Sequence, residues 1–173
     1  EGAYGEYIGE IGTKMYAEAN GSSGSGAIFT MYTLNGAELT GKAHSTGYGV
    51  LSTEGALVET KNGNAGEVSD RTYEADLSGE TATGSGVFIE SILSNYGGIV
   101  TGNSVTGKGV EAGYYESYPD PYSGEDYPSE LNGSTETGFG IMMRDFYENG
   151  EEIEVEAGSI GLTSGKINGQ SKD

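Results

Sequence analysis

Thr83-Gly84-Ser85-Gly86 is one of five Ser/Thr-Gly-x-Gly motifs that recur along the chain. Three of them are followed, nine positions after the second glycine, by an asparagine: residues 23–26 by Asn35, 83–86 by Asn95 and 137–140 by Asn149. The other two, residues 46–49 and 106–109, each follow the preceding motif by 23 residues. The chain therefore repeats a two-part unit with a period of 60 and then 54 residues. Such repetition indicates one structural unit that is stacked or paired several times, which builds frameworks more often than single active sites.

The two glycines of each motif favour close packing over phosphate binding. Glycines at positions i and i+2 leave one face of a strand without side chains, so another backbone or a tyrosine ring can approach closely. A dinucleotide-binding loop would need a third glycine at G-x-G-x-x-G spacing and a following helix, and a P-loop would need Gly-Lys-Ser/Thr. The sequence offers neither pattern. We therefore expect layers that press together at the five motifs.

Turn signals are dense, and helix signals are nearly absent. Glycine, which costs about 1 kcal/mol per helical position, makes up 32 of the 173 residues. Asn-Gly pairs are the strongest short hairpin signal, because a type I′ turn needs positive φ at both central residues. The turns of the repeated hairpins are expected at Asn35 and Gly36, at Asn95 to Gly98, and at Asn149 and Gly150.

The strands that flank these turns show two patterns. Residues 27–34, 87–93 and 141–147 carry apolar residues on both faces, whereas residues 37–43 and 152–157 alternate apolar and polar residues. The predicted fold class is all-β, with antiparallel hairpin repeats of roughly ten to twelve strands. These hairpins would form either a β-sandwich or a curved, solenoid-like sheet with polymerising edges.

A single repeat-built domain is expected over residues 1–173, because the length suits one core. Its units are predicted at about 19–78, 79–132 and 133–173, with N-terminal strands inside residues 1–18. Residues 113–130 depart from the repeat, since they hold all three prolines and five of the 13 tyrosines. Proline cannot donate to a sheet ladder, so this Tyr/Pro-rich arm is predicted to be a long ordered loop that makes contacts.

The composition indicates an acidic, extracellular protein. The formal net charge is −19, from 27 acidic and 8 basic residues, and such a surface repels nucleic acid and anionic lipid head groups. The chain has no cysteine, which excludes disulfides and thiolate metal sites, and no segment has the roughly 20 apolar residues of a membrane span. A start at Glu1 without methionine is typical of a secreted chain after signal removal. We therefore expect neither nucleic acid binding nor membrane insertion.

No catalytic constellation stands out. His44, the one histidine, is predicted to face solvent with Glu38 and Lys42, and no serine or aspartate motif marks it as a triad base. Carboxylates are abundant, but no tryptophan is available as a sugar platform beside a glycosidase pair. The sequence therefore predicts a protein that is not an enzyme, with no catalytic residue and no cofactor.

The stretch 111–156 combines 13 acidic residues with one basic residue, Arg144. It contains no EF-hand loop. One interpretation is a solvated acidic face; the other is weak Ca²⁺ or Mg²⁺ bridging between subunits, with Asp120, Glu125 and Asp126 as candidate ligands.

Two N-glycosylation sequons begin at Asn20 and Asn132. Both coincide with expected hairpin turns, where an attached glycan would be exposed.

The acidic, Gly- and Tyr-rich, cysteine-free composition, the mature-looking start and the repeated Thr-Gly-x-Gly and Asn-Gly segments resemble secreted, self-assembling β-rich envelope proteins. The resemblance covers the whole chain and is greatest to the sheath proteins of filamentous methanogenic archaea. It implies a β-sheet subunit stacked edge to edge, in an amyloid-like manner, into rings, tubes or fibres around archaeal cells.

We therefore expect an extracellular structural subunit that self-assembles with copies of itself through β-strand edges into a sheath, tube or fibre. Natural monomers block their sheet edges with lysine and proline, and the sequence contains few of either. The alternative is a monomeric β-rich adhesin or carbohydrate-binding module that holds a glycan through rows of Thr and Tyr. In that alternative, the protein has glycans as its partners.

Overall fold

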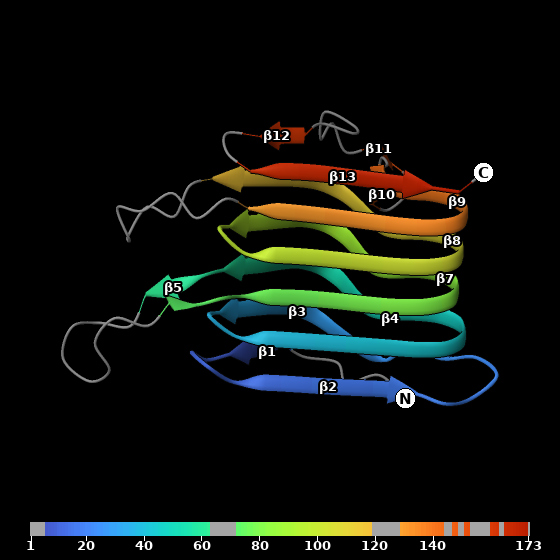
Figure 1. The fold of residues 1–173 in the computed structure, drawn as a ribbon, viewed down its shortest axis with the longest axis horizontal. Coiled ribbons are helices and arrows are strands. Elements are labelled where there is room, and N and C mark those ends of the chain that lie inside the picture. The colour runs from blue at the N-terminus through green and yellow to red at the C-terminus, as the bar shows by residue number, and fades with distance from the viewer. Residues whose placement is uncertain are drawn as a thin grey trace.

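The chain folds as a stack of parallel coils (Figure 1). The computed structural model describes residues 6–62, 72–118, 129–143, 147–148, 151–152, 160–162 and 165–172. One nine-stranded sheet contains β1 (Glu6–Gly9), β2 (Lys14–Ala19), β3 (Ala27–Asn35), β4 (Glu38–Glu59), β7 (Asp76–Tyr96), β8 (Ile99–Tyr118), β9 (Glu130–Met143), β12 (Ile160–Leu162) and β13 (Lys166–Ser171). Every ladder between two of these strands is parallel.

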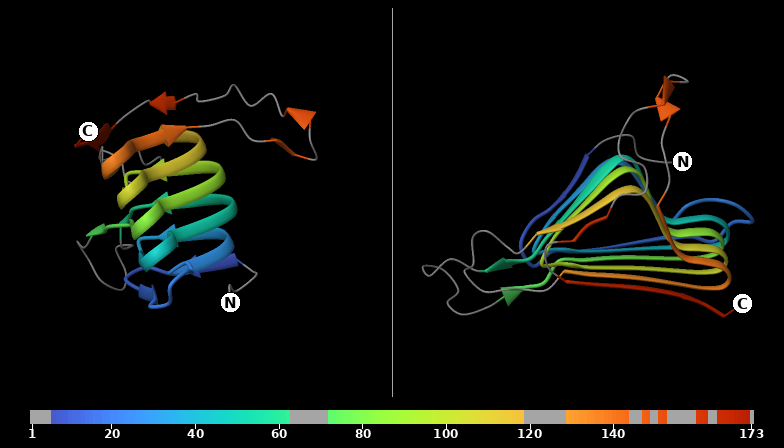
Figure 2. Two further views of the ribbon diagram at one scale, coloured as in Figure 1. Left: turned by 90° about the vertical axis from the view of Figure 1, so that its right-hand side faces the viewer. Right: turned by 90° about the horizontal axis from the view of Figure 1, so that it is seen from above.

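Strand β4 shows how one coil is built. Residues 38–46 cross a flat first face, residues 46–49 turn a corner with a Thr-Gly-x-Gly motif, residues 50–52 form a second face, and residues 55–59 form a third. At the bend between the last two faces, the Ser52 hydroxyl donates to the Gly55 carbonyl at 2.6 Å and accepts from the Gly55 N–H at 3.1 Å. Viewed along the stack, successive coils superpose as a triangle (Figure 2).

The register assigns each strand segment to one of the three faces. Face 1 consists of residues 14–19, 38–46, 76–83, 99–106, 130–137 and 166–171. Face 2 consists of residues 27–29, 50–52, 87–89, 110–112 and 141–143. Face 3 consists of residues 6–9, 31–35, 55–59, 92–96, 114–118 and 160–162.

The expected antiparallel hairpins are wrong for the stack. Asn35-Gly36 and Asn95 to Gly98 lie at the corner between faces 3 and 1, where the chain turns into the next coil without reversing. Gly36 has the positive φ that was expected, +63°, but its N–H donates to Glu59 of the neighbouring coil at 2.7 Å. The Asn95 side chain closes its own corner, accepting from the Gly98 N–H at 2.8 Å. Asn-Gly chemistry supplies a tight turn, and a corner uses that turn as readily as a hairpin does.

Two short antiparallel pairs lie off the stack. Strand β5 (Lys61–Asn62) pairs with β6 (Thr72–Tyr73), and β10 (Tyr147–Glu148) pairs with β11 (Glu151–Glu152). The second pair flanks Asn149 and Gly150, which themselves lie outside the described residues.

The interior is filled by rows of similar side chains, because an unshifted parallel register places equivalent coil positions next to one another. Face 1 contributes a fully buried row of Leu39, Leu77, Val100 and Leu131, and face 2 a row of Val50, Val87 and Val110. Burying each such side chain stabilises the fold by about 1.5–3 kcal/mol. The alternation predicted for residues 37–43 is confirmed, with Ala37, Leu39 and Ala43 buried.

The five Ser/Thr-Gly-x-Gly motifs stack on one another at the corner between faces 1 and 2, which we name the Gly corner. The first glycine of every motif has a φ between 128° and 150°, and a Cβ on Gly84 would lie 2.1 Å from the Gly47 carbonyl oxygen. The second glycine faces the opposite strand, so that a Cβ on Gly86 would lie 2.4 Å from the Asn103 nitrogen. The close approach of another backbone at these motifs is thus confirmed.

Face 1 adds a further glycine row at the same place, formed by Gly41, Gly79, Gly102, Gly133 and Gly169. A Cβ on Gly102 would lie 2.0 Å from the Gly109 carbonyl oxygen. The backbones of faces 1 and 2 therefore touch without side chains between them, and the corner is narrow.

Buried hydroxyls join successive coils at the Gly corner. Thr81 donates to the Gly47 carbonyl at 3.1 Å, Ser104 to the Gly84 carbonyl at 3.1 Å, and Thr135 to the Val105 carbonyl at 3.3 Å. Each bond links a face 1 side chain to the preceding coil and satisfies a carbonyl at the turn.

The structural repeat is one coil, not the two-part unit. The second glycines of the motifs, at positions 26, 49, 86, 109 and 140, are separated by 23, 37, 23 and 31 residues, yet all stack in one row. The longer spacings contain extra residues at the corner between faces 3 and 1, where β4 ends at Glu59 and β8 at Tyr118. An insertion at a corner leaves the register of the faces unchanged.

The Tyr/Pro-rich arm begins later than residue 113. Residues 114–118 continue β8 in register with β7 as part of face 3, and Tyr115 is fully buried there. Glu130 already belongs to β9, and residues 119–128, with all three prolines, lie outside the described residues.

We predict that Gly102→Ala lowers the free energy of unfolding by about 3 kcal/mol or more, since overpacking against rigid backbone is costly. Gly169→Ala is the matched control: Gly169 occupies the same row, but a Cβ there would have its nearest contact at 3.6 Å. Urea unfolding followed by circular dichroism measures both. Equal effects of the two substitutions would contradict backbone contact at the Gly corner.

Candidate functional site

The two ends of the stack expose strand edges that are not paired in the described part of the chain. At the N-terminal end these edges belong to β1, β2 and residues 27–29 of β3. At the C-terminal end they belong to β12, β13 and residues 141–143 of β9. Unpaired edges present rows of N–H and C=O groups that can template another strand.

Half-buried apolar side chains lie at the same two ends. Seven such residues pack against the fully buried core: Tyr7, Met15, Ala17 and Phe29 at the N-terminal end, and Ile141, Met143 and Ile167 at the C-terminal end. Each belongs to the first or last layer of its face. Within the described part of the chain, the interior rows therefore end in side chains that are covered on one side.

A cavity of about 450 Å³ opens at the N-terminal end, lined by Met15, Ala17, Ala19, residues 23–26, Ala27, Ile28 and Phe29. An aromatic cluster lies beside it. The Phe29 ring is 5.5 Å from Tyr7 and 5.2 Å from the buried Tyr32 between ring centroids. This end is concave, and its lining combines apolar side chains with Ser23 and Ser25.

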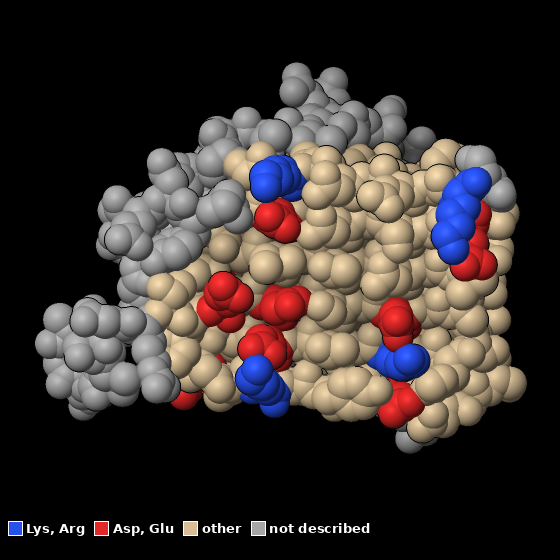
Figure 3. All heavy atoms as spheres, in the orientation of Figure 1, with Lys and Arg blue, Asp and Glu red and all other residues tan. Residues whose placement is uncertain are grey.

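Face 1 is a flat polar surface with almost balanced charge (Figure 3). Its outward side chains include four lysines and six carboxylates: Lys14, Lys42, Lys166, Lys172, Glu18, Glu38, Asp76, Glu80, Glu130 and Glu136. Every lysine pairs with a carboxylate of a neighbouring coil, as in Lys42 with Glu80 at 2.8 Å and Lys172 with Glu136 at 2.7 Å. Face 1 thus carries about −2 of the −19, and most of the acidic charge lies elsewhere.

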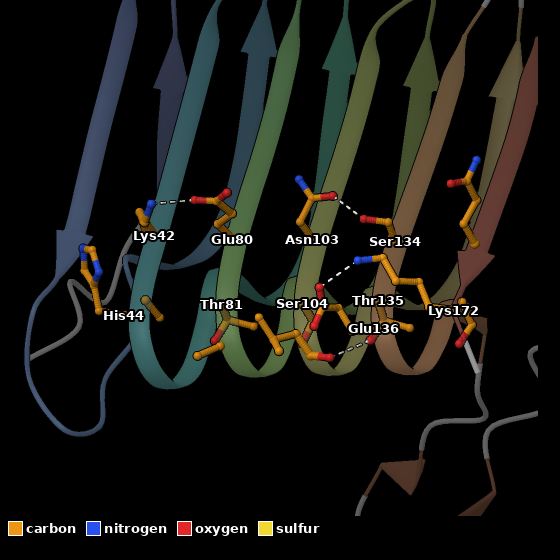
Figure 4. Close-up of a pocket in the computed structure, with 15 residues that line it drawn as sticks. Lys42, His44, Glu80, Thr81, Asn103, Ser104, Ser134, Thr135, Glu136 and Lys172 are labelled. Carbon is orange, nitrogen blue, oxygen red and sulfur yellow. Dashed lines mark hydrogen bonds and ion pairs between the residues drawn. The ribbon is translucent and has the colours of Figure 1, made fainter.

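A shallow groove of about 520 Å³ runs across face 1 beside the Gly corner (Figure 4). Its walls carry hydrogen-bonding groups from successive coils, including the Lys42–Glu80 pair and the Ser134 hydroxyl that donates to Asn103 at 2.6 Å. Ala82 and the half-exposed Val105 provide a small apolar area in it. The groove can hold an elongated polar molecule aligned with the stack.

His44 is exposed on face 1, as the sequence predicted, and its ring hydrogen-bonds the Glu18 carboxylate of the preceding coil. That bond lowers the pKa of Glu18, and the Lys172 ammonium lowers the pKa of Glu136. Among the described residues, the His44 ring therefore makes a surface contact between two coils with Glu18.

The sequon asparagines occupy two different settings. Asn20 is exposed at the end of β2, beside the bend that leads to the first motif. Asn132 is not in a hairpin turn but near the start of β9, where its side-chain amide oxygen accepts from the Asn168 side-chain amide at 2.7 Å. Side chains alternate between the two sides of a strand. Because Gly133 takes the inward position, the neighbouring Asn132 side chain lies on the outer side of face 1.

The acidic stretch 111–156 does not form one acidic face. Glu111 is buried on face 2, where Ser85 donates to it at 2.5 Å; Glu116 lies on face 3, and Glu130 and Glu136 lie on face 1. Among the described residues no group of three or more His, Asp or Glu side chains is arranged to hold a metal ion. The candidate ligands Asp120, Glu125 and Asp126 lie outside them.

Sequence reasoning missed the apolar end residues as a functional set. Met15 and Ile167 occupy the same inward position as Leu39 and Leu131, so an alignment of coils would have placed them in the terminal layers. The 23-residue spacing was the available signal, but the corner insertions concealed it.

Comparisons with protein-family models, curated proteins and solved structures found no match. No helix of the described residues is long and apolar enough to cross a membrane.

Asp76 gives a test of face 1 electrostatics. Burial raises the pKa of Asp76, opposed by a hydrogen bond from the Ser78 hydroxyl at 2.5 Å. Because the folded-state pKa lies above the unfolded value, the ionised group costs stability at neutral pH, and this cost disappears as pH falls through the folded-state pKa. We predict that Asp76→Asn is more stable than the parent at pH 7, and that the difference shrinks towards pH 4.

Urea midpoints at several pH values between 7 and 3.5 measure this difference. Glu136→Gln is the control of opposite sign, since its carboxylate has a lowered pKa and contributes stability that is lost on acidification. If Asp76→Asn were less stable than the parent by an amount that does not change with pH, the raised pKa assigned to Asp76 would be refuted.

Proposed function

We propose that the chain is an extracellular structural subunit that self-assembles through its β-strand edges into a sheath, tube or fibre around cells. The observation that carries this proposal is that, among the described residues, unpaired strand edges and half-buried apolar side chains coincide at both ends of the stack. Stacked repeats normally need polar capping units to stay soluble. The terminal layers here have Met15 and Phe29 at one end and Ile167 at the other.

Assembly has to overcome the repulsion between subunits of charge −19. Backbone ladder bonds and burial of the end residues supply short-range attraction, and face 1 adds little repulsion because its charges are nearly balanced. Salt screens the rest over about 10 Å at 0.1 M. Ca²⁺ or Mg²⁺ would add bridging between acidic surfaces of neighbouring subunits.

The proposed role is noncatalytic, with no cofactor. On face 1, the lysines form ion pairs with carboxylates of neighbouring coils, as Lys42 does with Glu80. Such pairs stabilise a structural framework, and most of the described chain belongs to the regular stack.

We predict that the purified chain forms ordered multimers, that Ca²⁺ or Mg²⁺ strengthens them, and that low ionic strength or a chelator weakens them. Ile167→Asp should reduce assembly at least tenfold, because it places a charge at the C-terminal end of an interior row. Val105→Asp is the control: it adds the same charge at a half-exposed position in the middle of face 1.

Sedimentation velocity and negative-stain microscopy measure the assembly, with circular dichroism to verify that both variants fold. A parent chain that stays monomeric at high concentration in every salt would overturn the proposal.

The groove on face 1 favours a second candidate function, a carbohydrate-binding module for neutral glycans. Its near-neutral surroundings and repeated amide, hydroxyl and paired ionic groups suit a polyhydroxylated chain aligned with the stack. This function predicts saturable binding of neutral oligosaccharides in calorimetry, weakened at least fivefold by Asn103→Ala. Ser94→Ala, on face 3, is the control. No heat of binding from any neutral oligosaccharide would exclude this candidate.

A further inference from the structure

We propose that copies of the chain join head to tail, with β13 of one copy pairing in parallel and in register with β2 of the next. This inference rests on the proposed function and specifies its interface. The occupant of each exposed end is then a second copy, whose opposite end continues the same ladders.

The register follows from the rows of face 1. Asn168 and Tyr16 occupy one outward row through Asn132, Thr101, Ser78 and Thr40. Ile167 and Met15 terminate the adjacent inward row. Extending the ladder by one strand therefore places Asn168 opposite Tyr16 and covers Ile167 with Met15, so two half-buried apolar side chains become buried together.

The charges at the two ends of the stack favour one direction of joining. Residues 166–172 carry Lys166 and Lys172 with no carboxylate, a charge of +2. At the other end, residues 6–19 carry three glutamates and one lysine, a charge of −2. The described terminal segments of the two ends are therefore opposite in charge, and this opposition favours head-to-tail contact over either symmetric dimer.

One opposition in the join is unfavourable. Lys166 and Lys14 share a row, so they would meet across the new pair of strands. Each already lies beside a carboxylate of its own copy, Glu130 for Lys166 and Glu38 for Lys14. The row then reads acid, base, base, acid, and the like charges are partly neutralised.

The three faces do not join equally. The described residues place six strand segments on face 1, six on face 3 and five on face 2. When β13 meets β2 and β12 meets β1, residues 141–143 stay two strand spacings from residues 27–29 of the next copy. Cohesion therefore comes from faces 1 and 3, and face 2 is interrupted at every join.

Engineered disulfides test this geometry directly, because the chain has no cysteine of its own. Paired positions in neighbouring strands are about 4.8 Å apart, within the range that a disulfide spans, whereas Cα atoms more than about 7 Å apart cannot be bridged. The test variant is Tyr16→Cys with Asn168→Cys, both at exposed positions.

Three sets of controls match it. Tyr16→Cys with Gln170→Cys is offset by two residues along the strand, and Ile28→Cys with Met142→Cys spans the interrupted face 2. The third set consists of the single variants Tyr16→Cys and Asn168→Cys. Each of them can cross-link only through a symmetric contact between like ends.

Under mild oxidation, non-reducing gels should show a ladder of covalent multimers for the test variant, at least tenfold above every control, because a heterologous contact generates open chains. Multimers in sedimentation without this ladder, or single-cysteine variants that cross-link as well, would overturn the head-to-tail register and leave the proposed function standing. A parent chain that forms no multimers would overturn both.

Discussion

The contact between two glycine rows at the Gly corner is the constraint on which the rest of the structure depends. Gly102 faces Gly109, and Gly86 faces Asn103, at distances that leave no space for a Cβ. A chain that must bring these backbones together once per coil has to return to the same corner in every coil. Parallel stacking achieves this, and it aligns the remaining positions into rows. Leucine then lies beside leucine on face 1, and hydroxyls such as Thr81 bond to the preceding turn.

A stack built in this way has no intrinsic last layer. Every coil offers the next one the same ladder, the same apolar row and the same glycine platform, and the terminal layers of the described residues offer them still. Met15 and Ile167 are covered on one side, as are the edges of β2 and β13. The high negative charge opposes association over long distances, whereas the row contacts act only at strand spacing. Association therefore responds to ionic strength, which changes the long-range repulsion and leaves the row contacts nearly unchanged.

Much of the local structure could be predicted from the sequence, but the strand direction could not. The glycine motifs predicted close backbone contact, N-terminal strands were expected inside residues 1–18, where β1 and most of β2 lie, and the alternation at residues 37–43 gave the buried side correctly. The error came from Asn-Gly, which signals positive φ and a tight turn but does not determine whether the chain reverses or turns a corner. Insertions at the corner after Glu59 and after Tyr118 then hid the 23-residue coil, because a corner tolerates extra residues without any change of register. The end residues were missed for the same reason, since recognising them requires the coils to be aligned first.

The central claim is that assembly continues the parallel stack of coils, with the strands perpendicular to the direction of growth. X-ray fibre diffraction from aligned assemblies tests it most directly. The account predicts a reflection at about 4.7–4.9 Å along the fibre axis, which is the spacing of hydrogen-bonded strands. The same reflection perpendicular to the fibre axis, with strands running along the fibre, would contradict it.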